Sequence, residues 1–291
     1  MSDDPVIIEA AINGVTTKRQ NPHVPRDADE IAADGLACFD AGAAIVHNHI
    51  DGGAGLSGPD AAARYAECWR PILGRRPDAL LYPTVNPGPG GKPRLDHLAP
   101  LAQLTTLRFG VVDPGSVNLG GVDGDGLPRG GFVYANSFDD IASAFALCRS
   151  LGIGPNIAIY EPGFLRVVVA YERAGQLPTG TFVKLYLSTD RGYMGAPFGL
   201  PPTPAGLSAY LELLDGTSIT WAVSVVGGDV IASDVARLAL DAGGHLHVGL
   251  EFYGGERTPT NVELVDEAVA LCAAAGRPVA SCADAARLLG L

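Results

Sequence analysis

The sequence lacks any long apolar segment. No apolar run in its 291 residues reaches the roughly 18 residues that a helix needs to cross a bilayer. The N-terminus, MSDDPVIIEA, also lacks the basic stretch followed by an apolar core that directs secretion. We therefore expect a cytoplasmic protein that does not associate with a membrane.

Cysteine is scarce, and its spacing excludes a disulfide framework. The five cysteines are odd in number, lie far apart in mostly helical apolar patterns and include no Cys-x-x-Cys pair. This arrangement is typical of buried free thiols in a reducing compartment.

Basic residues are also few, with 20 Lys and Arg against 32 Asp and Glu and a net charge of −12. Nucleic-acid binding needs clustered Lys and Arg to contact phosphates, so the charge pattern argues against a nucleic-acid partner. It does not exclude a small anionic substrate, because a few local cations can hold one. Hydrophobic residues make up 47% of the chain, which is typical of a globular protein.

Short apolar runs alternate with segments of helical periodicity along the whole chain. We predict strands over residues 6–12, 43–49, 79–85, 106–111, 156–160, 181–187, 220–225 and 245–250. We predict helices over residues 28–41, 60–73, 95–104, 137–151, 163–174, 204–214, 230–242, 261–275 and 282–289. Eight β-α units over residues 1–291 predict a single (β/α)8 TIM barrel with a short C-terminal helix. A doubly wound open sheet is the alternative.

Glycine and proline cluster in three longer connections, over residues 86–93, 113–131 and 191–204. In a barrel such loops lie with the active site at the C-terminal ends of the strands, so we expect mobile segments that cover a substrate. Disordered decoration is the alternative for residues 120–131.

The segment AAIVHNHIDGG carries the first chemical signal. His47 and His49 are two residues apart at the end of a predicted strand, so their imidazoles point to the same side. Glu251 follows the eighth predicted strand. In a barrel the eighth strand pairs with the first, which lies beside the second, so Glu251 can supply the third ligand. Two imidazoles and one carboxylate predict a divalent metal site. An ordinary surface His-x-His pair is the alternative.

A second signal is the turn Gly227-Gly228-Asp229 before a predicted helix. Barrels often bind phosphate after the seventh and eighth strands, so backbone amides here are candidates for binding an anionic part of a substrate. A tight turn without a ligand is the alternative.

Several motifs together resemble one known family. They are AAINGVTT, AGAAIVHNHID, GSVN, IYEPG, WAVSVVGG, GGHLHVGLE and NVELVDEAVALCAAAGRPVAS, in this order. The sequence resembles, nearly from end to end, the β-keto acid cleavage enzymes related to 3-keto-5-aminohexanoate cleavage enzyme.

The resemblance implies a barrel that binds Zn2+ through His47, His49 and Glu251 and assembles as a homo-oligomer, commonly a tetramer. It implies condensation of a β-keto acid with acetyl-CoA and cleavage of the product to acetoacetate and a new acyl-CoA. Positions that contact substrate in the family correspond here to Asn13, Thr84, Ser116, Asn118 and Glu161. Thr84 replaces a serine and keeps its hydroxyl.

The departures from the family pattern concern proton transfer and charge. Phe252 stands where the family usually has an aspartate that transfers a proton, and His247 where it usually has an arginine. Thr16 and Asp51 likewise replace a usual glutamate and arginine. Either another base, such as His247, Glu161 or Asp51, has taken over, or the chain uses the same metal for a different step.

His247 is four residues before Glu251, so strand alternation predicts the same face for both, and imidazole titrates near neutral pH. The alternative is a neutral histidine hydrogen-bonded inside the barrel. Two other functions remain open: a metal-dependent aldolase or hydrolase without CoA, and a binding protein that has lost its chemistry. Four aromatic residues are candidate apolar walls for a neutral or hydrophobic substrate tail: Tyr193, Phe198, Phe252 and Tyr253.

Overall fold

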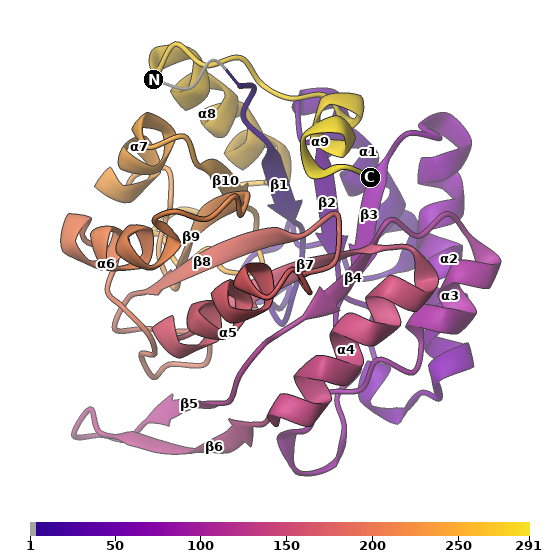
Figure 1. The fold of residues 1–291 in the computed structure, drawn as a ribbon, viewed down its shortest axis with the longest axis horizontal. Helices are drawn as coiled ribbons and strands as arrows, with labels where there is room; N and C mark the ends of the chain where they lie inside the picture. The colour runs from indigo at the N-terminus through magenta and orange to yellow at the C-terminus, as the bar shows by residue number, and fades with distance from the viewer. Residues whose placement is uncertain (1–3) are drawn as a thin grey trace.

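Eight parallel strands form the central sheet of the computed structural model, which describes residues 4–291. The strands are β1 (Ile8–Ala11), β2 (Ile45–Asn48), β3 (Leu80–Pro83), β4 (Phe109–Val112), β7 (Gly154–Ile159), β8 (Phe182–Ser188), β9 (Trp221–Val226) and β10 (His245–Val248). Their order is β3-β2-β1-β10-β9-β8-β7-β4. The two end strands, β3 and β4, approach each other and nearly close the sheet (Figure 1). The predicted (β/α)8 barrel is confirmed.

The strand register explains how distant segments reach one place. β1 pairs with β2 on one side, where Ala11 lies opposite His47, and with β10 on the other, where Ala10 lies opposite Val248. The C-terminal ends of β2 and β10 are therefore separated by β1 alone. Because these strands are parallel, the residues that follow them emerge at the same end of the barrel.

Helices surround the sheet (Figure 1). They are α1 (Ala28–Ala41), α2 (Gly58–Arg75), α3 (Leu98–Leu104), α4 (Phe138–Leu151), α5 (Pro162–Arg173), α6 (Pro204–Leu214), α7 (Asp234–Asp241), α8 (Asn261–Ala274) and α9 (Cys282–Leu289). Side-chain caps define several starts: Ser137 before α4, Thr260 before α8 and Ser281 before α9 each form a capping box. The sequence patterns located α1, α6 and α9 to the residue.

Two helix starts differ from prediction by three or more residues. α3 begins at Leu98 rather than at residue 95, after a loop in which Arg94 bonds the carbonyls of Pro87 and Leu56. α7 begins at Asp234 rather than at residue 230. The Asp229 carboxylate accepts bonds from the amides of the next residues, Ile231 and Ala232, and so forms a turn where a helix was expected.

The connection after β4 corrects a second expectation. Part of the segment predicted as a glycine-rich loop forms an antiparallel hairpin of β5 (Val117–Val122) and β6 (Pro128–Tyr134). It projects from the barrel (Figure 1). At its turn, Asp123 accepts bonds from the amides of Asp125 and Leu127. The paired strands are ordered structure, so the alternative that residues 120–131 form a disordered insertion is excluded.

A buried polar network crosses the barrel interior. Glu9 of β1 accepts bonds from Tyr82 and Asn156, and its carboxylate lies 3.7 Å from Lys184 Nζ and 3.1 Å from His247 Nε2. Burial opposes ionisation of Glu9, but Lys184 and His247 lower its pKa well below the usual value. Glu9 therefore stays ionised inside the apolar barrel.

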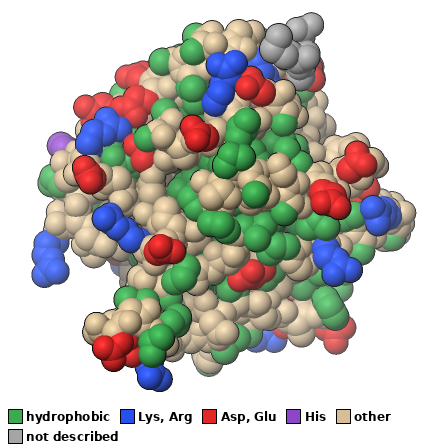
Figure 2. All heavy atoms as spheres, turned by 90° about the vertical axis from the view of Figure 1, so that its left-hand side faces the viewer, with side chains coloured by type: hydrophobic (Ala, Val, Ile, Leu, Met, Phe, Trp, Pro, Cys, Tyr) green, Lys and Arg blue, Asp and Glu red, His purple; other side chains and the backbone are tan. Residues whose placement is uncertain are grey.

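Other observations agree with the composition. All five cysteines are buried and free. In residues 4–291, no helix is both long and apolar enough to cross a membrane. On the face shown in Figure 2, Lys and Arg side chains are interspersed with Asp and Glu rather than gathered into a basic patch.

Candidate active site

Three side chains converge at the C-terminal end of the barrel. His47 lies in β2, His49 follows it directly, and Glu251 follows β10 after a turn at Gly249, whose φ is 121°. One ligand atom from each side chain lies within 4.8 Å of the other two. The predicted grouping of His47, His49 and Glu251 is therefore present.

The spacing of these atoms fits a metal ion. Nε2 of His47 lies 3.3 Å and Nε2 of His49 lies 3.1 Å from the nearest carboxylate oxygen of Glu251. Two atoms that each bind one tetrahedral ion at about 2.1 Å are about 3.4 Å apart. Although the atoms are close, neither Nε2 of His49 nor Oε2 of Glu251 has a hydrogen-bond partner. Buried polar atoms usually have a partner, and a cation bound between these two atoms would be that partner.

The surroundings hold the ligands in the required protonation states. Nδ1–H of His47 donates to the carbonyl of Tyr82 at 3.2 Å, which leaves Nε2 free to bind a metal. Burial lowers the pKa of His47 to about 3. Burial also tends to raise the pKa of Glu251, but His49 and His47 hold it at about 2. A neutral imidazole and an ionised carboxylate are the forms that bind metals.

The loop after β1 supports these ligands. The Asn13 side chain bonds both the amide and the carbonyl of His49, at 2.8 and 3.1 Å. Gly14 follows with a φ of +52°, and a Cβ there would lie 2.2 Å from Cγ of Glu251. Only glycine fits against the glutamate in this conformation.

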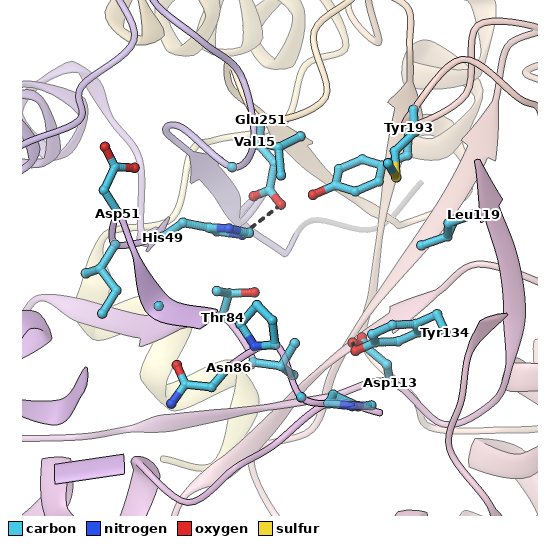
Figure 3. Close-up of a pocket in the computed structure, with 18 of the residues that line it drawn as sticks. Val15, His49, Asp51, Thr84, Asn86, Asp113, Leu119, Tyr134, Tyr193 and Glu251 are labelled. Carbon is cyan, nitrogen blue, oxygen red and sulfur yellow. Dashed lines mark hydrogen bonds and ion pairs between the residues drawn. The ribbon is translucent and has the colours of Figure 1, made fainter. Parts of the chain in front are cut away.

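The site opens into a cavity of about 670 Å³. This volume is within the usual range for a small-molecule site. The polar lining includes His49, Thr84, Asn86, Asp113 and Glu251. The apolar and aromatic lining includes Val15, Val85, Leu119, Phe132, Tyr134, Tyr160, Tyr193 and Met194. Figure 3 shows His49 and Glu251 on one side and Asp113 with Tyr134 on the other. The cavity thus combines a predicted metal site with a largely apolar wall.

Sequence comparison identifies the family. The family model described as "beta-keto acid cleavage enzyme" matches residues 5–291. The chain belongs to this family. It is 26% identical to 3-keto-5-aminohexanoate cleavage enzyme of Acetoanaerobium sticklandii, with 98% of each chain covered. It is 30% identical to 3-oxoadipate:acetyl-CoA acetyltransferase of Cupriavidus necator, with 99% of this chain and 95% of the relative covered. The chain is therefore an enzyme of the β-keto acid cleavage family.

Solved structures support the fold. A ternary complex of ObcA with a C4-CoA adduct and oxalate has a TM-score of 0.65 at 14% identity, covering 93% of this chain and 68% of that one. The 3-dehydroquinate dehydratase of Geobacillus kaustophilus has a TM-score of 0.53 at 10% identity, covering 95% and 94%. At these identities the likeness concerns the barrel alone.

The structure distributes the predicted substrate-contacting residues unevenly. Thr84 lines the cavity, whereas Asn13 is buried behind it with its amide engaged by backbone groups. Ser116 is exposed and exchanges hydrogen bonds with the backbone of Asn136. Asn118, on the hairpin, is exposed and outside the cavity lining. Only Thr84 of these four therefore reaches the cavity.

The two other predicted catalytic residues lie outside the cavity lining. Oε1 of Glu161 accepts a bond from the amide of Gly199 at 3.0 Å, which holds the loop after β8. His247 is 1% exposed and lies between Glu9 and Ser224. Its Nδ1 is 3.0 Å from Ser224 Oγ, and its Nε2 is 3.1 Å from the Glu9 carboxylate. Strand alternation does not continue past Gly249, so His247 and Glu251 do not reach the same cavity.

The glycine pair also has local partners. The Gly227 amide donates to the carbonyl of Phe252 at 2.9 Å, and the Gly228 carbonyl accepts from Gly254 at 2.8 Å. Because α7 begins later than expected, no helix N-terminus follows the pair directly. The observed contacts are those of a turn that joins two loops.

Of the four aromatic residues expected as walls, Tyr193 lines the cavity. Phe252 packs behind it, with ring centroids 5.6 Å apart. Three residues that no sequence pattern indicated also line the cavity, from loops and the hairpin: Arg26, Lys92 and Tyr134. These positions are not periodic, and no local pattern marks them.

Proposed function

We propose that the protein is a zinc-dependent enzyme that condenses a β-keto acid with acetyl-CoA and releases acetoacetate and a new acyl-CoA. The observation that carries the proposal is the His47, His49 and Glu251 group opening into a cavity in a member of this family. Two relatives support the chemistry, since one is named as a keto-acid cleavage enzyme and another as an acetyl-CoA acetyltransferase.

The three ligand side chains would hold the ion, and two nitrogens with one oxygen suit zinc. When bound, zinc supplies a Lewis acid that stabilises negative charge on a β-keto acid. The chain itself supplies a half-buried hydroxyl at Thr84, which lines the same cavity and can orient a substrate oxygen. The apolar walls favour a substrate with a neutral or hydrophobic tail.

The proposal needs a test that separates metal binding from turnover. The protein is loaded with zinc and incubated with acetyl-CoA and a panel of β-keto acids, and acetoacetate and acyl-CoA are detected by mass spectrometry. We expect both products from wild type. His49→Ala should lose bound zinc and both products, whereas the matched control His23→Ala, at an exposed histidine, should keep them. Zinc-free protein that still forms both products would refute the metal's role.

A second function is favoured by one observation. Phe252 packs against Tyr186 and Tyr193, with ring centroids 4.9 and 5.6 Å apart, and it has no group that accepts a proton. A metal-dependent aldolase or hydrolase of keto acids without CoA fits this departure. Turnover of the same panel in the absence of acetyl-CoA would favour this second function, and zinc binding without any turnover would favour a protein that only binds metal or metabolite.

The homotetramer suggested by the family resemblance is a further part of the proposal. Light scattering of the purified protein should give four times the mass of one chain. A monomer mass would contradict it.

A further inference from the structure

The ionisable side chains that line the cavity are nearly all engaged. Arg26 forms an ion pair with Asp51, and Lys92 Nζ lies 2.7 Å from Asp140. Glu251 is grouped with the two histidines. Among the acidic side chains that the structure places in the cavity lining, this leaves Asp113.

Asp113 directly follows β4 and is 8% exposed. Its Oδ2 accepts a hydrogen bond from the Tyr134 hydroxyl at 2.5 Å, whereas its Oδ1 is buried without a partner. Figure 3 shows the pair across the cavity from His49 and Glu251. A buried carboxylate oxygen without a partner is costly, so it needs a specific reason to be there. It is the kind of atom expected where a substrate proton is accepted.

We propose that Asp113 is the general base of this site and that Tyr134 is its positioning residue. The proposal rests on the function proposed above. The carbon between the keto and carboxylate groups of the substrate loses a proton to the carboxylate of Asp113, which lines the cavity. The C–H bond breaks, its electron pair enters the enolate, and an O–H bond forms on the carboxylate. Asp113 returns the proton to carbon when acetoacetate forms, which restores its charge.

The environment of Asp113 suits this role. Burial raises its pKa above the usual range, and Glu251 raises it further. The Tyr134 hydroxyl and Lys184 act in the opposite direction. A carboxylate with a raised pKa is a stronger base than one in water, and it still ionises to act.

His247 and Glu161 do not compete for this role in the structure. His247 contacts Glu9 and Ser224, and Oε1 of Glu161 accepts from the Gly199 amide. Neither residue is part of the cavity lining. Asp51 does line the cavity, but its carboxylate is paired with Arg26.

The test uses zinc-loaded protein and acetoacetate in D2O, with deuterium entry at the carbon between the two carbonyl groups followed by NMR. Asp113→Asn should slow enzyme-dependent exchange and product formation by about 10²–10⁴-fold, the usual contribution of a general base. Bound zinc and the melting temperature should not change. The matched control is Asp34→Asn, which removes a half-buried carboxylate outside the cavity and should exchange at the wild-type rate.

Tyr134→Phe keeps the carboxylate and serves as the second variant if Asp113→Asn does not fold. The Tyr134 hydrogen bond lowers the pKa of Asp113, so its loss should raise that pKa. Since the base acts only when ionised, the acid limb of kcat/KM should move to higher pH. A packing role for Tyr134 would lower the rate without moving this limb.

The outcomes separate the two proposals. Wild-type product formation with normal exchange in Asp113→Asn, or an unmoved acid limb in Tyr134→Phe, would overturn the role of Asp113 alone. Asp113-dependent exchange without acyl-CoA would support Asp113 and refute the acyl transfer. A wild-type protein with neither exchange nor products would overturn both.

Discussion

The side-chain amide of Asn13 bonds both backbone groups of His49. Its Oδ1 accepts from the His49 amide at 2.8 Å, and its Nδ2 donates to the His49 carbonyl at 3.1 Å. The residue therefore holds the end of β2 against the loop after β1. Through this contact, a buried side chain that does not line the cavity sets the direction of a candidate metal ligand.

We expect Asn13→Ala to weaken the proposed zinc binding about 10–100-fold, the usual effect of losing a group that orients a ligand. Zinc affinity is measured by competition with a chelator. The control is Asn21→Ala, which also removes a buried amide, here one that donates to the Pro259 carbonyl. Equal losses of affinity in both variants would contradict the role assigned to Asn13.

Gly14→Ala should lower zinc affinity by displacing Glu251. The new Cβ would lie 2.2 Å from Cγ of Glu251, so the carboxylate has to move. Gly175→Ala is the control, because Gly175 has a similar positive φ of +65° but open space around its Cβ position. Both variants should lose about 1–2 kcal/mol of unfolding free energy from the backbone conformation. If Gly14→Ala binds zinc as tightly as the control does, the contact is not needed.

Lys184→Met should destabilise the barrel by about 3–5 kcal/mol, because it leaves the ionised Glu9 buried without its cation. Urea unfolding measures the change. Adding Glu9→Gln removes the unpaired charge, so the double variant should recover part of the loss. A double variant less stable than Lys184→Met would show that the buried pair does not behave as a unit.

His245 should make the protein less stable in mild acid. Burial, with Arg277 nearby, lowers its pKa to about 3, whereas an unfolded histidine has a pKa of about 6.5. Between these values the unfolded state binds a proton that the folded state does not. The contribution of neutral His245 to the free energy of unfolding is complete above the unfolded pKa. It is lost as the pH falls towards 3, by about 1.4 kcal/mol per pH unit.

His245→Asn should flatten this dependence, since the amide oxygen can still accept the bond from Ile7 N–H. Urea unfolding at several pH values between 7 and 5 measures the slope. His23→Asn, at an exposed position, should keep the wild-type slope. Identical slopes for wild type and His245→Asn would contradict the assignment.

The sequence was sufficient to predict the barrel strands and the three candidate metal ligands. Apolar runs without alternation predicted buried parallel strands, and strand alternation placed His47 and His49 on one side. The pairing of first and last strands in a barrel then predicted that Glu251 would join them. Each of these inferences uses a period or a closure rule that does not depend on particular loop contacts.

Loop positions were less predictable. Residues 113–131 were expected to be a loop, because their glycines and charges hide the strand pattern. Most of the hairpin of β5 and β6 lies there. His247 was expected beside Glu251, but the backbone turn at Gly249 ends the alternation between them. The GSVN motif indicated Ser116 and Asn118 as substrate contacts. The direction of their side chains, however, depends on the hairpin.

The sequence by itself therefore determined the barrel, the eight strands and the three candidate metal ligands, because strand period and parallel register are local or repeated properties. Only the tertiary structure decided which other side chains face the substrate. Asp113 contacts Tyr134 at the base of the hairpin. Asn13 contacts His49 beyond the ends of the neighbouring strands β1 and β2. Such contacts join residues that are distant in the chain, and their geometry depends on the course of every loop between them.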